Sequence, residues 1–128
     1  MPALQEQNLN ARRLFETRFR PNYPRSFRLL QDMTLAAAKA VKHQGKVSIF
    51  GKDKGEVAFT SFMETSRRLV STMLSEGATT IVPDQPNQFE RINAIVKAFF
   101  VAYPNWEEAA VVWDGFAQAA RQEGQRYN

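Results

Sequence analysis

Apolar side chains recur every three or four residues along most of the chain, a spacing typical of amphipathic helices. Five helices are predicted on this basis, at residues 4–20, 25–43, 61–77, 87–103 and 105–124. Three of them open with a pattern that indicates an N-terminal capping box, beginning at Ser61, Asn87 and Asn105. Glycine or proline stands at or just beyond the end of each helix, where these residues commonly stop helical structure. The expected fold is therefore mainly α, a compact bundle of about five helices.

Between the second and third predicted helices the apolar period changes from about 3.6 to about two. On both sides of a basic tip, apolar side chains alternate with others, as they do at Val57 and Phe59. Alternation of this kind predicts β-strands. We therefore expect one small β-hairpin, at about residues 46–59, inserted after the second helix. Because an isolated hairpin is only marginally stable, its apolar face is expected to pack on the helices.

Composition is typical of a single globular domain, and we expect residues 1–128 to form one domain. Of the 128 residues, 44% are hydrophobic and 23% are charged, which is a globular rather than a disordered composition. The chain has no cysteine and one histidine. It therefore lacks the residues needed for a disulfide, an iron–sulfur cluster or the usual structural zinc site. We expect no metal and no cofactor.

No segment has the pattern of a signal peptide or a membrane span. The first residues lack the apolar run that a secretory signal needs. The longest apolar stretch, at residues 92–103, is interrupted by Asn93 and Lys97 and is far shorter than the ~20 residues that cross a bilayer. We expect a soluble protein of the cytoplasm that does not engage membranes.

Charge is distributed unevenly along the chain. Residues 1–54 contain eleven basic and four acidic side chains, a net charge of +7, whereas residues 55–128 contain six and nine, a net charge of −3. A concentrated basic region attracts polyanions and acidic protein surfaces. The candidate nucleic-acid-binding residues are ten cations of the basic part: Arg12, Arg13, Arg20, Arg25, Arg28, Lys39, Lys42, Lys46, Lys52 and Lys54.

Residue spacing does not support a catalytic or nucleotide-binding site. Gly51 and Gly55 enclose two lysines, whereas a phosphate-binding P-loop needs GxxxxGK[ST]. A solvated turn or a basic finger is the better interpretation. His43 stands at the end of a predicted helix, where an imidazole suits the helix dipole. Glu107 and Glu108 diverge by about 100° on a helix and belong to a capping turn. We therefore expect no enzymatic activity.

Two functions remain open from the sequence. The first is a non-catalytic binding protein that contacts the phosphate backbone of DNA or RNA, or a nucleoprotein complex, through its basic N-terminal surface. The second is a protein–protein interaction module, an adaptor, regulator or subunit of a larger assembly that binds an acidic protein partner. Arg18 beside an apolar stripe and Val111 on a polar helix face are consistent with such a contact surface. A basic face that meets only solvent is a third interpretation of the same charges.

Overall fold

The computed structural model describes residues 4–44 and 54–127, which form helices joined by short connections. Along the chain they are α1 (Leu4–Leu14), η1 (Phe15–Phe19), α2 (Arg20–Asn22), α3 (Pro24–Lys42), α4 (Lys54–Glu76), η2 (Ala78–Ile81), α5 (Gln88–Ala102) and α6 (Glu107–Tyr127). Here η1 is a π-helical turn and η2 is a 3₁₀ turn. The prediction of a mainly helical bundle is confirmed. Among these helices, none is both long enough and apolar enough to cross a membrane.

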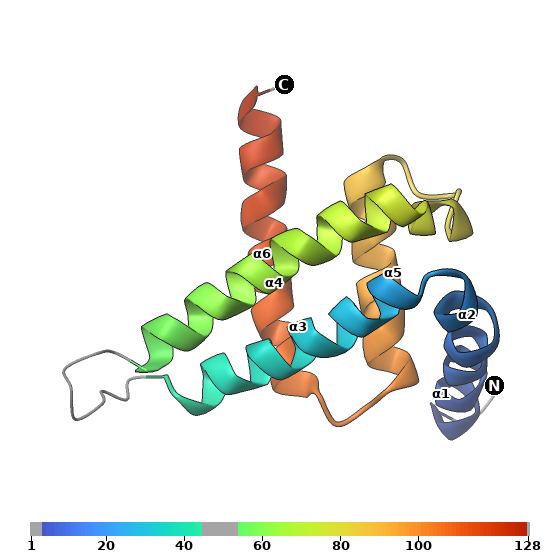
Figure 1. The fold of residues 1–128 in the computed structure, drawn as a ribbon, viewed down its shortest axis with the longest axis horizontal. Coiled ribbons are helices and arrows are strands. Elements are labelled where there is room, and N and C mark those ends of the chain that lie inside the picture. The colour runs from blue at the N-terminus through green and yellow to red at the C-terminus, as the bar shows by residue number, and fades with distance from the viewer. Residues whose placement is uncertain (1–3, 45–53, 128) are drawn as a thin grey trace.

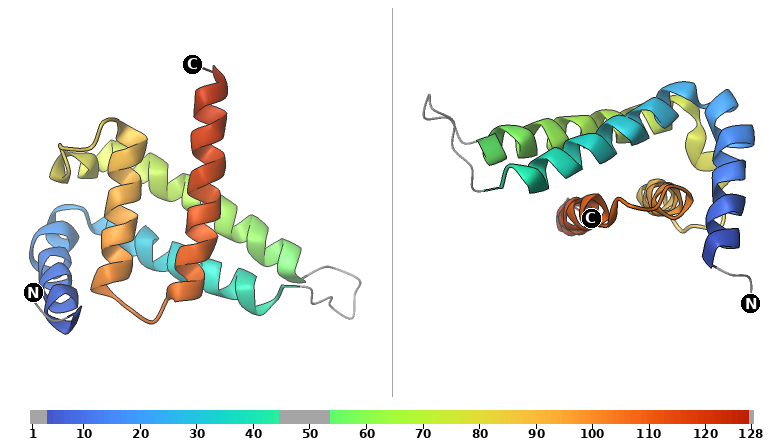
Figure 2. Two further views of the ribbon diagram at one scale, coloured as in Figure 1. Left: turned by 180° about the vertical axis from the view of Figure 1, so that it is seen from behind. Right: turned by 90° about the horizontal axis from the view of Figure 1, so that it is seen from below.

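The long helices form two layers (Figure 1). In the first layer, α3 and α4 lie side by side and run antiparallel. The second layer contains α5 and α6 and crosses the first steeply, with α6 packed on α3 (Figure 2). At one end of both layers, α1 packs against α5. The layer of α3 and α4 therefore has one face covered by α5 and α6 and one face open to solvent.

The first predicted helix is present, but it ends later than its prolines indicate. The chain stays helical through Pro21 as far as Asn22. A π-turn accommodates the proline, because the backbone N–H of Arg20 donates to the carbonyl oxygen of Phe15. Pro21 then occupies the first turn of α2, where its missing N–H is not required. The helical geometry breaks at Tyr23, with φ −132° and ψ 61°.

The predicted β-hairpin at residues 46–59 is wrong where the structure describes it. From Lys54 onward this segment forms the first turns of α4, and the described residues contain no β-strand. The rest of the segment lies outside the described residues. The alternation at Val57 and Phe59 spans too few residues to distinguish the period of a strand, two, from the period of a helix, 3.6. Phe59 instead begins a helical series that continues through the buried Phe62, while Val57 faces solvent.

Of the three predicted capping boxes, the N-cap bond at α5 is confirmed, although the Glu90 carboxylate binds Arg121 instead of completing the box, and the other two boxes are wrong. The Asn87 side chain accepts a hydrogen bond from the backbone N–H of Glu90 at 2.9 Å. Ser61 lies well inside α4, because α4 begins at Lys54. Asn105 has a left-handed backbone conformation, with φ 87°, and lies two residues before α6. It therefore shapes the turn between two helices, as asparagine tolerates this conformation.

Aromatic rings join the layers of the core, and one polar pair joins the two helices of the second layer. Phe15 in η1 lies 5.7 Å from Phe99 in α5 and 6.5 Å from Phe27 in α3, measured between ring centroids. Further along, Trp113 of α6 is fully buried, and its indole Nε1 donates to Oδ1 of the buried Asn93 at 2.9 Å. These contacts orient the second layer on α3. They determine which face of α3 remains exposed.

Candidate nucleic-acid interface

The ten predicted cations are distributed over several helices. Those within the described residues are Arg12 and Arg13 in α1, Arg20 in α2, Arg25, Arg28, Lys39 and Lys42 in α3, and Lys54 at the start of α4. Lys46 and Lys52 lie outside the described residues. Since α1 packs against α5 at the end of the layers, its cations do not continue the row of cations on α3.

Two of the N-terminal cations make contacts within the molecule. Arg12 Nε donates to the carbonyl oxygen of Ala102 at 3.2 Å, and its guanidinium group lies 5.2 Å from the centroid of the Tyr103 ring. Arg20 forms an ion pair with Glu16, with Nη1 and Oε2 3.1 Å apart. These contacts attach α1 and α2 to their neighbours, so Arg12 and Arg20 already have structural roles.

Glu16 places a carboxylate among these N-terminal cations. The Tyr103 hydroxyl donates to Glu16 Oε1 at 2.6 Å. This hydrogen bond, together with Arg20 and Arg12, holds the pKa of Glu16 below its ordinary value, although burial acts in the opposite direction. Burial raises the pKa of Tyr103, and the bond to Glu16 raises it further. Glu16 is therefore ionised at neutral pH and offsets part of the positive charge at this end of the molecule.

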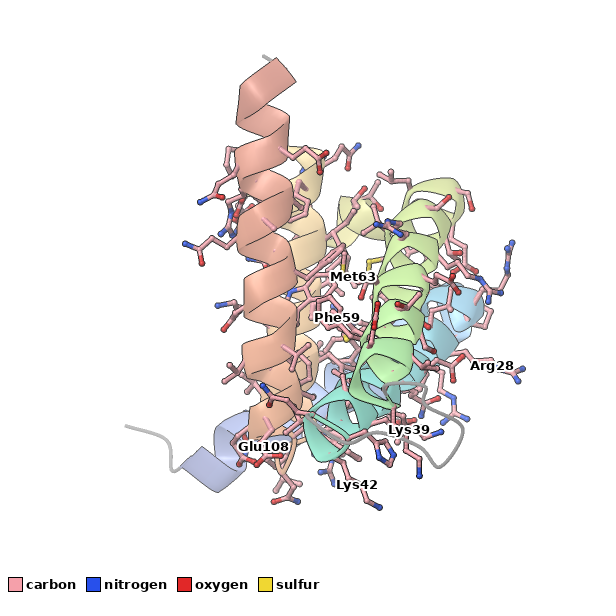
Figure 3. The ribbon with its side chains drawn as sticks, turned by 90° about the vertical axis from the view of Figure 1, so that its left-hand side faces the viewer. Arg28, Lys39, Lys42, Phe59, Met63 and Glu108 are labelled. Carbon is pink, nitrogen blue, oxygen red and sulfur yellow. The ribbon has the colours of Figure 1, made fainter. Side chains whose placement is uncertain are left out.

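The open face of α3 carries a continuous row of exposed side chains. In order they are Arg25, Arg28, Asp32, Leu35, Lys39 and Lys42. Steps of three and four residues align them along one side of the helix, opposite the buried Leu30 and Ala37. Figure 3 shows Arg28 and Lys39 on the side of α3 that faces away from α6, and Lys42 near the end of the helix. Four cations and one acid make this face strongly basic.

A hollow lies between α3 and α4 next to this row, and we call it the arginine hollow. Its walls include Arg25, Arg28 and Asp32 from α3, and Arg68, Ser71 and Thr72 from α4. The hollow has a volume of about 440 Å³. Arg68 reaches it from a distant part of the sequence because α3 and α4 pack along their length. The residues that line the hollow thus include three arginines, two hydroxyl-bearing residues and one aspartate.

Within the described residues, these three guanidinium groups form neither ion pairs nor hydrogen bonds. The ion pairs there join Arg20 to Glu16, Lys97 to Asp114 and Arg121 to Glu90. Asp32 lines the same hollow, but among the described residues its carboxylate forms no ion pair with an arginine. Like charges at close range repel each other. An anion bound in the hollow relieves this repulsion, and guanidinium groups suit a phosphate or a carboxylate.

Glu76 fixes the two walls of the hollow relative to each other. Its carboxylate, at the end of α4, accepts hydrogen bonds from the backbone N–H and the hydroxyl of Ser26, each at 2.7 Å, and from the backbone N–H of Arg25 at 3.3 Å. Burial raises the pKa of Glu76, but these hydrogen bonds and the Arg25 charge outweigh it and lower the pKa below its ordinary value. The end of α4 thus caps the start of α3 and fixes the position of the Arg28 helix relative to the Arg68 helix.

The sequence prediction omitted Arg68, Ser71 and Thr72. They belong to residues 55–128, whose net charge of −3 conceals the one cation among them, Arg68. A local signal identifies them, because steps of three and four residues place Arg68, Ser71 and Thr72 on one side of a helix. Their proximity to Arg28 is a tertiary feature that no local pattern contains.

The other polar residues considered in the sequence occupy structural positions. His43 is the C-terminal cap residue of α3, as predicted, and its buried Nδ1 has no hydrogen-bond partner among the described residues. Glu107 and Glu108 lie in the first turn of α6. Asp114 Oδ1 forms an ion pair with Lys97 Nζ at 3.2 Å. In the described part of the chain, no three acidic or histidine side chains are arranged to hold a metal ion.

A second surface feature is an apolar groove along α4 and α6, with a volume of about 770 Å³. Its walls include Phe59 and Met63 from α4 and Val111 and Phe116 from α6. Figure 3 shows Phe59 and Met63 between these two helices. Val111 is 70% exposed and Phe59 is 49% exposed, so the groove presents apolar surface to solvent. Phe59 and Arg68, nine residues apart, lie on opposite sides of α4, which separates the groove from the arginine hollow.

Comparisons with protein-family models, with curated proteins and with solved structures found no match. A function is therefore inferred from the charge and geometry of these two surfaces. One presents arginines that form no ion pair within the described residues, and the other presents exposed apolar side chains.

Proposed function

We propose that the protein is a non-catalytic binding protein that holds the phosphate backbone of a nucleic acid, free or in a nucleoprotein complex, on the open face of α3 and α4. The observation that carries the proposal is the gathering of Arg25, Arg28 and Arg68 around one hollow, where none of the three forms an ion pair within the described residues. A guanidinium group binds phosphate oxygens through two parallel hydrogen bonds, which lysine does not form.

The row of cations on α3 extends the arginine hollow into an elongated surface. From Arg25 to Lys42 the helix rises about 26 Å, at 1.5 Å per residue. Phosphates of one strand of a duplex are spaced about 3.4 Å along the helix axis, so this surface matches about seven of them. An extended polyanion fits this row better than a compact anion, which occupies only the hollow.

Contacts of this kind produce a steep dependence on salt and little dependence on base sequence. Each neutralised phosphate lowers the slope of log K against log salt by about 0.9 on duplex DNA and about 0.7 on a single strand. Four to six phosphate contacts therefore predict a slope of about −3 to −5. The same reasoning predicts that binding is lost well above physiological salt.

A pair of charge-reversal variants tests the proposal. Arg68→Glu changes the charge inside the arginine hollow, and Lys97→Glu makes the same change of charge on α5, in the other layer. With fluorescently labelled single-stranded and duplex DNA and RNA, we expect Arg68→Glu to weaken binding about tenfold and Lys97→Glu less than about twofold. Equal losses from the two variants, or no binding by the unmodified protein at low salt, contradict the proposal.

A protein partner is the second candidate, and the apolar groove favours it. An acidic partner uses the same arginines as a nucleic acid does, but the exposed Val111 and Phe59 call for a partner with apolar side chains. Val111→Glu places a charge in the groove, whereas Val101→Glu alters a residue of α5 that is 46% exposed and does not line the groove. This candidate requires a partner whose affinity falls with Val111→Glu and is unchanged with Val101→Glu.

A further inference from the structure

The arginine hollow contains an acidic residue that a site for phosphate alone does not need. Asp32 lines the hollow together with the three arginines, and its side chain belongs to the exposed row of α3. A carboxylate repels a phosphate at short range. In the described residues it is not used in an ion pair with the arginines around it. Its presence therefore indicates a ligand that offers a hydrogen-bond donor beside its phosphate.

We propose that the arginine hollow takes a ribonucleotide unit of an RNA strand, with its phosphate on Arg28 and Arg68 and its ribose 2′-hydroxyl on the Asp32 carboxylate. This inference rests on the proposed function, and it deepens that function by assigning RNA rather than DNA as the ligand. The 2′-hydroxyl is the group by which a protein distinguishes RNA from DNA at a given position. A carboxylate is a suitable acceptor for it, as at ribose hydroxyls in dinucleotide-binding folds.

The spacing of Arg28 and Asp32 agrees with this assignment. They are four residues apart on α3, so their Cβ atoms are about 5–6 Å apart on the same side of the helix. In RNA the 2′-hydroxyl and the 3′-phosphate are carried by adjacent carbons of one ribose. A donor and an anion joined in this way can meet a carboxylate and a guanidinium group on successive helical turns. The amino groups of a base lie further from the phosphate, so they fit this spacing less well.

The rest of the hollow is consistent with one nucleotide unit. Leu29, which follows Arg28 in the sequence, also lines the hollow. It provides an apolar surface beside the polar residues. Ser71 and Thr72 supply hydroxyl groups on the opposite wall, and hydroxyl groups bind phosphate and sugar oxygens. The hollow has a volume of about 440 Å³, and the exposed row of α3 continues beyond Asp32 to Lys39, where a strand can extend from the hollow.

Three probes of equal length isolate the hydroxyl group. Oligouridine carries the 2′-hydroxyl, oligodeoxyuridine lacks it, and 2′-O-methyl oligouridine keeps the oxygen but cannot donate. If the 2′-hydroxyl donates a charge-assisted hydrogen bond to Asp32, we expect the unmodified protein to bind oligouridine about tenfold more tightly than either of the other two probes at the same salt concentration. The methylated probe separates donation by the hydroxyl from the sugar conformation that it favours.

Asp32→Asn is the decisive variant, and Glu108→Gln is its control. Both remove one negative charge, but Glu108 lies at the start of α6, away from Arg28 (Figure 3). We expect Asp32→Asn to reduce the tenfold preference for oligouridine to about twofold or less, because the 2′-hydroxyl then loses its charged acceptor, whereas the relief of phosphate repulsion affects both probes alike. Glu108→Gln is expected to leave the preference unchanged. Circular dichroism of both variants verifies that the fold is retained.

The outcomes distinguish this inference from the proposed function. Equal and salt-dependent binding of oligouridine and oligodeoxyuridine overturns the ribose assignment and leaves the proposed function standing. An RNA preference that persists in Asp32→Asn overturns the role of Asp32. If the protein prefers one base equally in RNA and in DNA, the Asp32 carboxylate contacts a base, and the ribose contact is overturned. If free uridine monophosphate displaces the labelled probe at the same concentration as unlabelled oligouridine does, the ligand is not a strand and the assignment is overturned. No binding of any probe at low salt overturns both proposals.

Discussion

The capping of α3 by Glu76 gives the sharpest prediction for stability. Its carboxylate accepts three hydrogen bonds from Ser26 and Arg25, and Ser26 is fully buried. Glu76→Ala leaves the N–H and the hydroxyl of Ser26 without their partner in a place that water does not reach easily. A lost helix cap costs about 0.5–2 kcal/mol, and a buried polar group without a partner costs about 1–3 kcal/mol. We expect the free energy of unfolding to fall by about 2 kcal/mol in total.

Urea unfolding at neutral pH measures this loss, and thermal unfolding provides a second measurement. For a chain of this size, 2 kcal/mol corresponds to a decrease in Tm of about 8 °C. Glu64→Ala is the matched control, because Glu64 is an exposed residue of the same helix and its replacement is expected to change the free energy of unfolding by less than about 0.5 kcal/mol. A loss from Glu76→Ala no larger than the loss from Glu64→Ala refutes the capping argument.

The same cap predicts a dependence of stability on pH. The folded state holds the pKa of Glu76 below its ordinary value of 4.5, so the unfolded state binds more protons in acid. The contribution of the ionised carboxylate is therefore fully present above about pH 5 and is lost as the pH falls through the folded-state pKa. Glu76→Gln removes this contribution. The difference in the free energy of unfolding between the unmodified protein and Glu76→Gln is expected to shrink in acid, and a constant difference contradicts this reasoning.

Three further predictions concern the core and the surface, and urea unfolding measures all of them. Asn93→Ala leaves the buried Nε1–H of Trp113 without an acceptor and is expected to cost about 2 kcal/mol. Phe15→Ala removes a buried ring that lies within 6.5 Å of four other rings, and we expect a loss of about 3–4 kcal/mol. Arg121→Gln breaks the partly exposed ion pair with Glu90 and is expected to cost less than about 1 kcal/mol. A loss from Arg121→Gln as large as that from Asn93→Ala contradicts the assignment of that ion pair to the surface.

Local patterns in the sequence predicted most of the helices. The second and fourth predicted helices, at 25–43 and 87–103, agree closely with α3 and α5. In both, an apolar stripe at helical spacing coincides with a local start or stop signal, such as the cap at Asn87. These signals depend on neighbouring residues only. A single sequence therefore contains enough information to find them.

The errors arose where the pattern was short or where tertiary contacts decide. The hairpin prediction depended on a few alternating residues, and from Lys54 onward the helical series of α4 prevails. The arginine hollow was missed for another reason. Arg68 approaches Arg28 only because α3 and α4 pack antiparallel, and the cap of Ser26 by Glu76 joins residues 50 positions apart. A sequence read in local windows contains no signal for either contact.

The central claim is that the cations of the open α3–α4 face bind phosphate, and the salt dependence of binding tests it most directly. The measurement compares the slope of log K against log salt for the unmodified protein and for a variant with Arg25, Arg28 and Arg68 all replaced by glutamine, on the same labelled RNA. If each arginine contacts one phosphate, the slope is expected to become less steep by about 2–3. An unchanged slope in the folded variant contradicts the claim, because it means that residues other than these three arginines neutralise the phosphates and release their counterions.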